Sequence, residues 1–414
     1  MISPPARNTR REPTLASSDL IVEVTDSFEE VNTTREDWDR FVLSVGGDLY
    51  VSYDWCRIWW RYYGKYRRLR LFTFRMSGQL VGLAPMFVEQ VRLGPIVIRI
   101  AKRVGSDSAL TIFALPLAAD YAAFCYRELI SKLIEDEKCD AVSFGFMPGD
   151  DPTLSSLRDS CEQLRGVLTC VRDAPAGPQT FFHLPDAFEK YLLALDSGQR
   201  QNYRRRLKQL KQAFDVKGDV VREASEARSA FDHFTDLHES QWRREGKPGH
   251  FGDWPHSTAF NSDLVDQLSR LDRFRMVRLL ADSRVIAYQY AFVFGGCCYW
   301  RLPARAPDNE LDRFGLGVLG MVQMFETMIN EGVGRVEAGV GHYDYKMRFG
   351  GEELQMRSFL VAAARPGTGL RVRLFLWLSD QLHFIYYRIW RLRVAPRLPF
   401  REGPLWRTWI RSRI

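Results

Sequence analysis

The residues best suited to chemistry lie between positions 337 and 349, where a short apolar strand leads through a glycine turn to a tyrosine–lysine pair. Tyr345 carries a phenol whose ordinary pKa near ~10 allows it to give a proton to a leaving group. Glu337 and Asp344 carry carboxylates, which are candidates to accept a proton. Lys346 follows Tyr345 directly. The structural alternatives are a buried aromatic ring for Tyr345 and a surface lysine after a strand for Lys346.

His238 is a further candidate for proton transfer. It lies in a predicted helix, with Trp242 one turn further along the same helix. A neutral imidazole, with an ordinary pKa near ~6.5, can accept an ammonium or hydroxyl proton at neutral pH. A helical histidine with a purely structural role is the alternative. We expect Trp242 and His342, which follows the glycine turn, to contact the acceptor substrate.

An anion-binding site is predicted at a glycine-rich helix start around Gly315 and Gly317. The first amides of a helix have no carbonyl partner within the helix and lie at the positive end of its dipole. Such an end suits a phosphate group. We therefore place a phosphate-bearing substrate on the backbone of Gly315, Leu316, Gly317 and Val318, with Arg313 beside it. The alternative is a helix start whose glycines serve only close packing.

A basic helix is predicted to begin at Ser197 as its N-cap and to run to about residue 214. Its apolar stripe recurs every three or four residues, at Tyr203, Leu207, Leu210 and Phe214. The remaining surface is basic: Arg200, Arg204, Arg205, Arg206, Lys208 and Lys211. Because exposed helices normally mix both signs of charge, we expect Arg204 and Arg205 to contact an anionic substrate. A solvated basic face is the alternative.

Size and composition indicate a globular protein of two domains with extensions. A length of 414 residues exceeds one ordinary domain, and 46% hydrophobic with 26% charged residues is typical of soluble proteins. We find no run of 18 apolar residues and no secretory signal near the N-terminus. Seven cysteines without CxxC spacing indicate reduced thiols in a cytoplasmic protein. We expect no metal, because the seven histidines are scattered and no HExxH motif occurs.

The chain repeats itself at an offset of 205 residues. Residues 70–87 read as strand, turn, strand and align without a gap to residues 275–292. A predicted helix and an apolar strand follow each hairpin, at 121–137 and 141–146 and again at 318–331 and 336–340. Chance similarity between unrelated α/β domains is the alternative. We predict two copies of one α/β domain.

The predicted boundary between the copies is the Pro/Gly-rich stretch 172–178. We divide the chain into a disordered N-terminus, a first domain, a second domain that carries the chemistry, and a helical tail rich in arginine and aromatic residues, at 1–20, 21–172, 179–365 and 369–414.

The order of these features resembles acyl-CoA-dependent acyltransferases of the GNAT type. The spacing of Glu337, Gly341, Tyr345, Lys346 and Phe349 is similar to the C-terminal signature of the CelD/BcsL-type acetyltransferases of cellulose biosynthesis. That family is related to the FemABX peptidyltransferases.

The resemblance extends from about Trp38 to Phe359 and shows two departures. The family usually has aspartate where Glu337 stands, and Arg313 lies two rather than three residues before Gly315.

The resemblance implies an α/β fold of tandem, duplicated GNAT-like domains, with mixed sheets flanked by helices and a basic amphipathic helical tail. It implies direct transfer of an acyl group from acyl-CoA to an amine or hydroxyl of a sugar or a polysaccharide or envelope precursor. The donor pyrophosphate is expected at Gly315–Val318, and Trp300 and Leu302 are expected to line the pantetheine. Lys346 is expected to contact anionic or developing negative charge. A covalent intermediate is not expected, since no GxSxG motif occurs.

Two other functions stay open. A FemABX-like transferase would use the basic helix to hold aminoacyl-tRNA or a lipid-linked phosphate. No heptad run occurs between residues 215 and 275, where those enzymes often insert a coiled-coil arm, and this favours acyl-CoA. The third reading is a non-catalytic partner of a membrane polysaccharide synthase. We expect no nucleic acid partner other than tRNA in the second reading.

The tail carries the net charge of the chain. Residues 369–414 contain ten arginines and two acidic residues, whereas the net charge of the whole chain is +7. Apolar residues recur every three or four positions from Val372 to Leu392, with Trp377 and Trp390 beside them. Such a helix suits the anionic inner face of a membrane. Packing against the second domain is the alternative.

Overall fold

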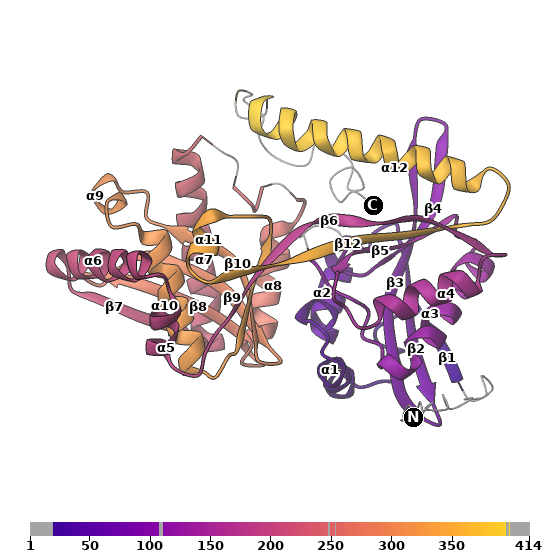
Figure 1. Cartoon of the computed structure of the whole chain (residues 1–414), viewed down its shortest axis with the longest axis horizontal. Coiled ribbons are helices and arrows are strands. Elements are labelled where there is room, and N and C mark those ends of the chain that lie inside the picture. The colour runs from indigo at the N-terminus through magenta and orange to yellow at the C-terminus, as the bar shows by residue number, and fades with distance from the viewer. Residues whose placement is uncertain (1–19, 107–110, 247–248, 253, 395–396, 398–414) are drawn as a thin grey trace, which may run out of the picture.

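One sheet of twelve strands runs through both halves of the chain (Figure 1). The computed structural model describes residues 20–106, 111–246, 249–252, 254–394 and 397. The order of the strands is β1-β2-β3-β4-β5-β12-β6-β11-β10-β9-β8-β7. The predicted mixed α/β architecture with flanking helices is therefore confirmed, and the two halves share a single sheet.

The strands of the first half are β1 (Leu20–Thr25), β2 (Arg68–Met76), β3 (Gln79–Leu93), β4 (Ile96–Arg103), β5 (Ala141–Pro148) and β6 (Leu168–His183). Those of the second half are β7 (Val216–Val221), β8 (Phe274–Ala281), β9 (Arg284–Phe294), β10 (Cys297–Arg305), β11 (Arg335–Val340) and β12 (Gly351–Ala363).

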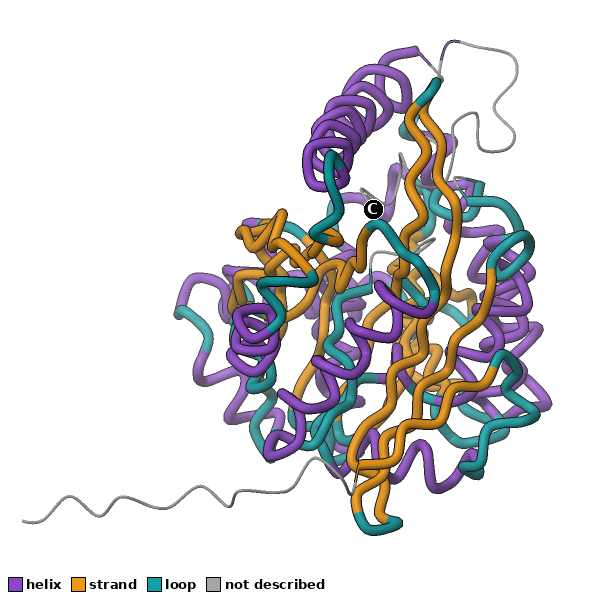
Figure 2. Tube along the Cα trace, turned by 90° about the vertical axis from the view of Figure 1, so that its right-hand side faces the viewer, coloured by secondary structure: helices purple, strands orange, loops and turns teal. Residues whose placement is uncertain are grey.

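Helices cover both faces of the sheet (Figure 2). The α-helices of the first half are α1 (Arg35–Ser44), α2 (Tyr53–Tyr63), α3 (Ala122–Ser131) and α4 (Leu154–Gln163). Those of the rest of the chain are α5 (Phe188–Ala194), α6 (Ser197–Ala213), α7 (Ala224–Arg244), α8 (Ser257–Ser269), α9 (Asn309–Asp312), α10 (Leu316–Asn330), α11 (Asp344–Arg348) and α12 (Thr368–Phe384). Short 3-10 turns are η2 (Leu49–Val51) and η3 (Ala119–Tyr121), and π-helical segments are η4 (Lys132–Asp136) and η5 (Ile385–Val394).

The two halves repeat the same element order and the same buried ion pair. In each half an antiparallel hairpin, β2–β3 or β8–β9, precedes a helix and a parallel strand. Arg70 opens the first hairpin, and its Nε donates to Glu137 at a distance of 2.5 Å. Arg275 lies 205 residues later, and its Nε donates to Glu331 at 2.7 Å. Each guanidinium also donates to the carbonyl of the residue before it, which makes the pairs equivalent in detail.

The last strand of each half is exchanged into the other half. β12 pairs antiparallel with β5 of the first half, and β6 pairs antiparallel with β11 of the second. β6 and β12 also pair with each other, from Gly351 opposite Phe182 to Ala363 opposite Leu168. The Pro/Gly-rich stretch 172–178, which we predicted as the boundary between the copies, lies within β6 rather than between two structured segments. The prolines are accommodated where the register shifts between Gln355 and Arg357.

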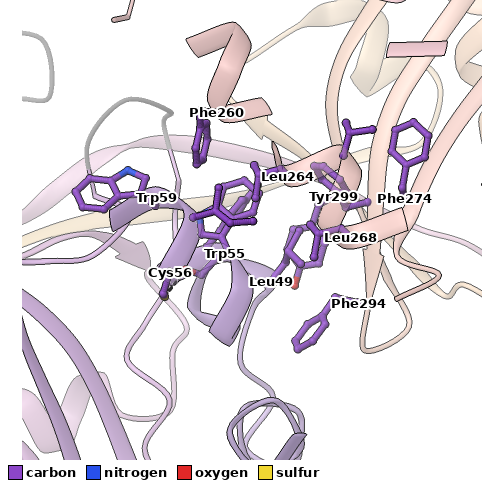
Figure 3. Close-up of a cluster of buried hydrophobic side chains, with 14 of the residues drawn as sticks. Leu49, Trp55, Cys56, Trp59, Phe260, Leu264, Leu268, Phe274, Phe294 and Tyr299 are labelled. Carbon is purple, nitrogen blue, oxygen red and sulfur yellow. Dashed lines mark hydrogen bonds between the residues drawn. The ribbon is translucent and has the colours of Figure 1, made fainter. Parts of the chain in front are cut away.

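A shared hydrophobic core joins the halves on one face of the sheet. α2 packs against α8, and Trp55 contacts Phe260 and Phe292 with ring centroids 5.8 and 6.2 Å apart (Figure 3). Trp38 is fully buried and its indole N–H donates to the carbonyl of Val51 at 2.8 Å. Because α2 belongs to the first half and α8 to the second, this core fixes the halves against each other.

The C-terminal helical segment packs back on the sheet. Val372, Phe375 and Leu376 of α12 are buried in a cluster with Leu360 and Ala362 of β12. Phe359, Val361 and Ala363 of β12 lie in the cluster on the opposite face, where α3 and α4 pack. This is expected, because successive side chains of a strand point to opposite faces of the sheet. No helix within the described residues is long and apolar enough to cross a membrane. Residues 395–396 and 398–414 of the tail lie outside the described residues, as does the N-terminus up to residue 19.

The strand exchange predicts that neither half folds alone. A chain cut before Asp186, in the exposed connection after β6, leaves β6 in the first fragment while both of its neighbours are in the second. We expect fragments 1–185 and 186–414 to be recovered in folded form only when they are co-expressed, as a stable complex seen by size exclusion and circular dichroism. A fragment 1–185 that is monomeric and melts cooperatively by itself would contradict the role given to the exchanged strands.

Candidate functional site

The centre of the second half is a place where two parallel strands separate. β10 and β11 pair over Cys297 to Tyr299 and then diverge. A bulge lies between Trp300 and Leu302, opposite Ala291 and Tyr290 of β9. Because of the bulge, Trp300 packs into the cluster under α10, whereas Leu302 packs into the core shared by the halves. The structure therefore does not place the two predicted pantetheine contacts on one face of β10.

Lys346 lies buried at this separation. It comes from the short helix α11, and its Nζ donates to the carbonyl of Ala338 on β11 at 2.6 Å. The same Nζ lies 5.4 Å from the ring centre of Trp300 and 4.5 Å from that of Tyr343. Burial lowers the pKa of Lys346 to about 8, although the Glu337 carboxylate opposes the shift. An ammonium held between aromatic rings, with few protein acceptors, is suited to meet an anionic group.

Tyr345 and His342 lie outside this buried centre. Tyr345 is partly exposed and packs against Tyr343 with ring centroids 6.0 Å apart. Burial and the Tyr343 phenol raise the pKa of Tyr345 to about 12, which makes it a weaker acid than an ordinary tyrosine. His342 is exposed between Glu353 and Asp344, with N–O distances of 2.6 and 3.0 Å. These hydrogen bonds raise the pKa of His342.

Glu337 is held by donors from three parts of the chain. Its Oε2 accepts from the Tyr50 hydroxyl at 2.6 Å, and its Oε1 accepts from Gln179 at 3.1 Å and from the amide of Gly339 at 2.8 Å. Tyr50 belongs to η2 of the first half and Gln179 to the exchanged strand β6. These three hydrogen bonds fix the position and orientation of the Glu337 carboxylate.

Arg301 and Asp48 extend the buried polar cluster. Arg301 is the bulged residue of β10, and its guanidinium donates to the Tyr50 hydroxyl at 3.2 Å. It also lies over the rings of Tyr50 and Trp55, at 5.6 and 5.2 Å. Asp48 accepts from the Tyr299 hydroxyl at 3.1 Å. Burial, reinforced by the charge of Glu337, raises the pKa of Asp48 to about 7. The cluster therefore combines side chains of both halves.

The start of α10 has free helix amides and an arginine beside it. Gly315 caps the helix with φ of +66°, a conformation that favours glycine, and a Cβ there would overlap the guanidinium of Arg206. Arg206 comes from the basic helix α6, so α6 and the α10 terminus lie together. Leu316 and Gly317 are the first residues of α10, whose amides have no partner within the helix. Gly317 is exposed, with open space where a Cβ would lie.

The other predicted residues of this terminus do not point to a ligand. Arg313 is exposed and its guanidinium lies 4.8 Å from the ring centre of Phe314. Leu316 is buried and Val318 is partly buried in the cluster under α10. What they offer to a ligand is therefore backbone rather than side chain.

His238 is buried and engaged at both ring nitrogens. Its Nδ1 lies 3.0 Å from the carbonyl of Pro303 on β10, and its Nε2 lies 3.0 Å from Nδ1 of His250. A carbonyl only accepts, so Nδ1 of His238 carries the proton and Nε2 accepts from His250. The basic nitrogen of the pair is then Nε2 of His250. Burial lowers the pKa of both imidazoles, to about 3 for His250. Trp242 packs edge-on against His250 at 4.9 Å.

The exposed face of α6 carries Arg204 and Arg205. Arg205 donates to Asn202 at 3.1 Å, and Arg204 lies 4.0 Å from the Glu189 carboxylate. The helix begins after Asp196, whose side chain accepts from the amides of Gly198 and Gln199, so the predicted N-cap at Ser197 is wrong by one residue.

The structure thus groups the predicted residues into two parts. Lys346, Glu337 and Trp300 meet where β10 and β11 separate, whereas the glycines of the α10 start meet α6. Among the residues of these groups, Tyr50, Gln179, Arg206 and Arg301 were not predicted as site residues from the sequence. The basic helix without acidic residues drew attention to Arg206, but its contact with Gly315, far away in sequence, could not be predicted. No sequence pattern connected Tyr50, Gln179 or Arg301 with the site, because each contacts a partner, Glu337 or Tyr50, on a different element.

Cavities lie away from the separated strands. One of about 630 Å³ is lined by residues of α1 and the β2–β3 hairpin, among them Asp37, Arg40 and Arg75. Another of about 370 Å³ lies between the start of α6 and α11, at Asp196, Gln199 and Arg348. Neither is lined by a residue of β10 or β11. The side chains of Trp300 on β10 and of Lys346, which follows β11, are both buried. No group of histidine, cysteine and acidic residues suited to a metal occurs within the described ranges.

The first half repeats the strand separation but closes it with an arginine. β4 and β5 pair over Ile100 to Lys102 and then diverge. Arg103 follows, is buried, and donates to the carbonyls of Phe113 and Phe146. The helix that follows, α3, begins at Ala122 without a glycine-rich start. These differences favour a supporting role for the first half.

Comparison with known proteins supports the assignment of the second half. Residues 197–347 match the sequence profile of the acetyltransferase (GNAT) domain. The prediction of an acyltransferase of the GNAT type is confirmed at this level, while the CelD/BcsL-type subfamily stays a prediction. None of the curated proteins matches the sequence.

Solved structures with the same architecture include FemX, with a TM-score of 0.58 and 11% identity over 79% of this chain and 96% of that chain. The C-terminal domain of a putative lysylphosphatidylglycerol synthetase from Agrobacterium fabrum has a TM-score of 0.46 and 12% identity, over 83% of this chain and 95% of that chain. A tandem GNAT protein from the clavulanic acid biosynthesis pathway has a TM-score of 0.41 and 13% identity, over 84% of this chain and 99% of that chain. Only the first similarity is close enough to carry an argument, and it concerns the fold. The chain therefore shares the fold of FemX, and residues 197–347 of its second half match the profile of the acetyltransferase (GNAT) domain.

Proposed function

We propose that the chain is an acyl-CoA-dependent N- or O-acyltransferase that transfers its acyl group directly to the acceptor. The observation that carries the proposal is the start of α10, where free helix amides and the Arg206 guanidinium meet on the domain that matches the GNAT profile. The two positive contributions act on the same point, and a pyrophosphate is the group they suit best.

The acyl arm of the donor would reach from α10 toward the separation of β10 and β11. An extended amide arm that enters there must compete with Lys346 for the carbonyl of Ala338. Once it is displaced from that carbonyl, the Lys346 ammonium is free to contact the thioester. Donor binding and the placement of Lys346 are therefore coupled in this proposal.

The reaction needs one proton to leave the acceptor and one to reach the thiolate. The acceptor nitrogen or oxygen attacks the thioester carbonyl, and the acceptor proton passes to a base. The carbon–sulfur bond then breaks, and the base returns the proton to the thiolate, which leaves as free coenzyme A. The Lys346 ammonium stabilises the oxyanion of the tetrahedral intermediate. We propose Nε2 of His250, the nitrogen of the His238–His250 pair that carries a free lone pair, as the base, although burial lowers the pKa of this imidazole to about 3. Glu337 positions the cluster through its three donors rather than acting as the base.

The acceptor class rests on the resemblance alone. Similarity to the CelD/BcsL-type family suggests a sugar or a polysaccharide or envelope precursor. We propose this class for the amine or hydroxyl that is acylated.

A FemABX-like transferase that uses aminoacyl-tRNA is the second candidate. The exposed Arg204 and Arg205 of α6, next to the α10 start, favour it, because a nucleic acid backbone would meet a continuous basic face. Salt-dependent binding of charged tRNA that Arg204→Ala and Arg205→Ala weaken, without binding of acyl-CoA, would establish this candidate.

A non-catalytic partner of a membrane synthase is the third candidate. The burial of Trp300 and Lys346 beside β10 and β11 favours it, because neither of the two cavities described above is lined by these strands. A chain that binds neither acyl-CoA nor tRNA would establish it.

Substitution of Gly317 tests donor binding. We expect Gly317→Asp to weaken acetyl-CoA or a longer acyl-CoA by about tenfold or more in isothermal titration, because a carboxylate then faces the pyrophosphate at the helix start. Gly317→Ala is the matched control, since a Cβ at this position meets open space, and it should bind as the wild type does. Gly315 is unsuitable, because its positive φ and the nearby Arg206 guanidinium make any side chain disruptive. Equal loss in both Gly317 variants would mean that packing, rather than charge, explains the effect.

The pH dependence of turnover tests the role of Lys346. Its lowered pKa predicts that activity falls as pH rises through about 8, because the ammonium is lost there. Lys346→Arg keeps a charge at higher pH and should remove this alkaline limb, while Lys346→Met should lower kcat by about 10²-fold or more across the range. Activity that instead rises through pH 8 in the wild type, and is absent in Lys346→Arg, would identify the neutral amine as a base.

The lowered pKa of Lys346 also predicts how the free energy of unfolding depends on pH, which is measured without substrate. Between pH 8 and 10.5 the unfolded chain holds the Lys346 proton more tightly than the folded chain, so the stability of the wild type should rise with pH in this window. In chemical denaturation, the free energy of unfolding of Lys346→Met should lack this contribution to the rise with pH. Identical pH profiles of unfolding for the two proteins would show that Lys346 is not held as described.

A further inference from the structure

The outer face of the C-terminal helical segment is apolar although nothing in the described structure covers it. Its exposed large apolar side chains are Leu370, Leu374, Trp377, Phe384, Ile385, Ile389 and Leu392. They make up half of the fourteen such side chains in the described part of the chain, yet they lie within 23 consecutive residues. Leu370 and Trp377 are 74% and 57% exposed. Scattered apolar residues are normal on a surface, whereas a concentration of this kind indicates a contact.

The opposite face of the same segment packs against the sheet. Val372, Phe375 and Leu376 are buried against β12, and Tyr386 extends this contact into η5. α12 is therefore apolar on two sides, of which one is buried. A helix that is apolar all round is usually buried all round. The outer side thus serves something other than the stability of the fold.

The charges on this segment are almost all positive. Residues 370–394 contain one acidic residue and five arginines, of which four are exposed: Arg371, Arg373, Arg388 and Arg393. The acidic residue, Asp380, is already paired with Arg172 at 2.7 Å. Arg371 is paired with Asp140 at 2.6 Å. The outer face therefore carries an excess of positive charge, which an anionic partner would balance.

We propose that this outer face docks on an anionic lipid surface, with its leucine, isoleucine and aromatic side chains inserted among the lipids and its arginines at the headgroups. Tryptophan and phenylalanine at the boundary between apolar and charged groups, together with arginine, suit the interface of a bilayer. The long axis of α12 lies along one side of the molecule, so the segment can lie flat on a membrane (Figure 1).

Charge complementarity distinguishes lipid from other occupants. A second copy docked through the same face would bring arginines against arginines. The remaining tail of this chain, residues 395–414, carries five arginines and one acidic residue, so it too has the wrong sign. A nucleic acid duplex has the right sign, but its outer surface is sugar and phosphate and does not match the seven exposed apolar side chains. An anionic membrane satisfies both requirements.

Docking would bring a loop of the candidate site close to the membrane. Arg391 of η5 lies near enough to His250 for its charge to contribute to the low pKa of that imidazole. The inference itself does not rest on the proposed reaction, because lipid binding is measured without turnover.

Vesicle flotation of the full chain tests the proposal. Vesicles of phosphatidylcholine with about 30% phosphatidylglycerol should carry the protein upward, whereas pure phosphatidylcholine should not, and high salt should weaken the binding. Trp377→Glu should weaken it by about tenfold or more, because an inserted ring is lost. Arg373→Gln and Arg388→Gln should each weaken it by about fivefold.

Two matched variants control for general effects. Leu193→Glu changes a side chain that is 66% exposed on α5, and Arg165→Gln changes an exposed arginine after α4; both should float as the wild type does. The proposal is overturned if the wild type fails to float, or binds neutral vesicles equally well. It is also overturned if Trp377→Glu abolishes a dimer seen by light scattering rather than lipid binding, or if tRNA competes fully with the vesicles.

Discussion

The pairing of β6 with β12 is the constraint on which the rest of the structure depends. Each strand ends one half of the chain and completes the sheet of the other, so the pairing joins two repeats into one sheet. It also fixes the centre of the molecule, because β6 carries Gln179 to Glu337 and β12 leads directly into α12. The candidate site and the C-terminal segment are consequently held by the same two strands.

The second consequence of this arrangement is a polar cluster that neither half could form by itself. Glu337 depends on Tyr50 from the first half, and Tyr50 in turn accepts from Arg301 of the second. Buried charges of this kind are costly unless each is paired, and here the hydrogen bonds supply the pairing. Lys346 differs, because aromatic rings surround most of its ammonium. It is thus the group with the most to gain from an incoming anion.

Local pattern was enough to predict the repeated elements. The offset of 205 residues located both hairpins, and the glycine-rich segment located the start of α10. The exchange of β6 and β12 was not predictable, since the pairing of Gly351 with Phe182 is set by tertiary structure. Pro175 and Pro178 favoured a linker on propensity, but a register shift lets them lie in a strand. Likewise Tyr345 and Lys346 are neighbours in sequence, yet the turn of α11 exposes one and buries the other.

Amide hydrogen exchange with and without acetyl-CoA tests the central claim most directly, because it reports where a donor binds without requiring an acceptor. The account predicts slower exchange at the start of α10, around Leu316 and Gly317, and on β11 near Ala338, where the arm would displace Lys346. Protection confined to the first half, around Arg103 and Phe146, or no change anywhere in the chain, would contradict it.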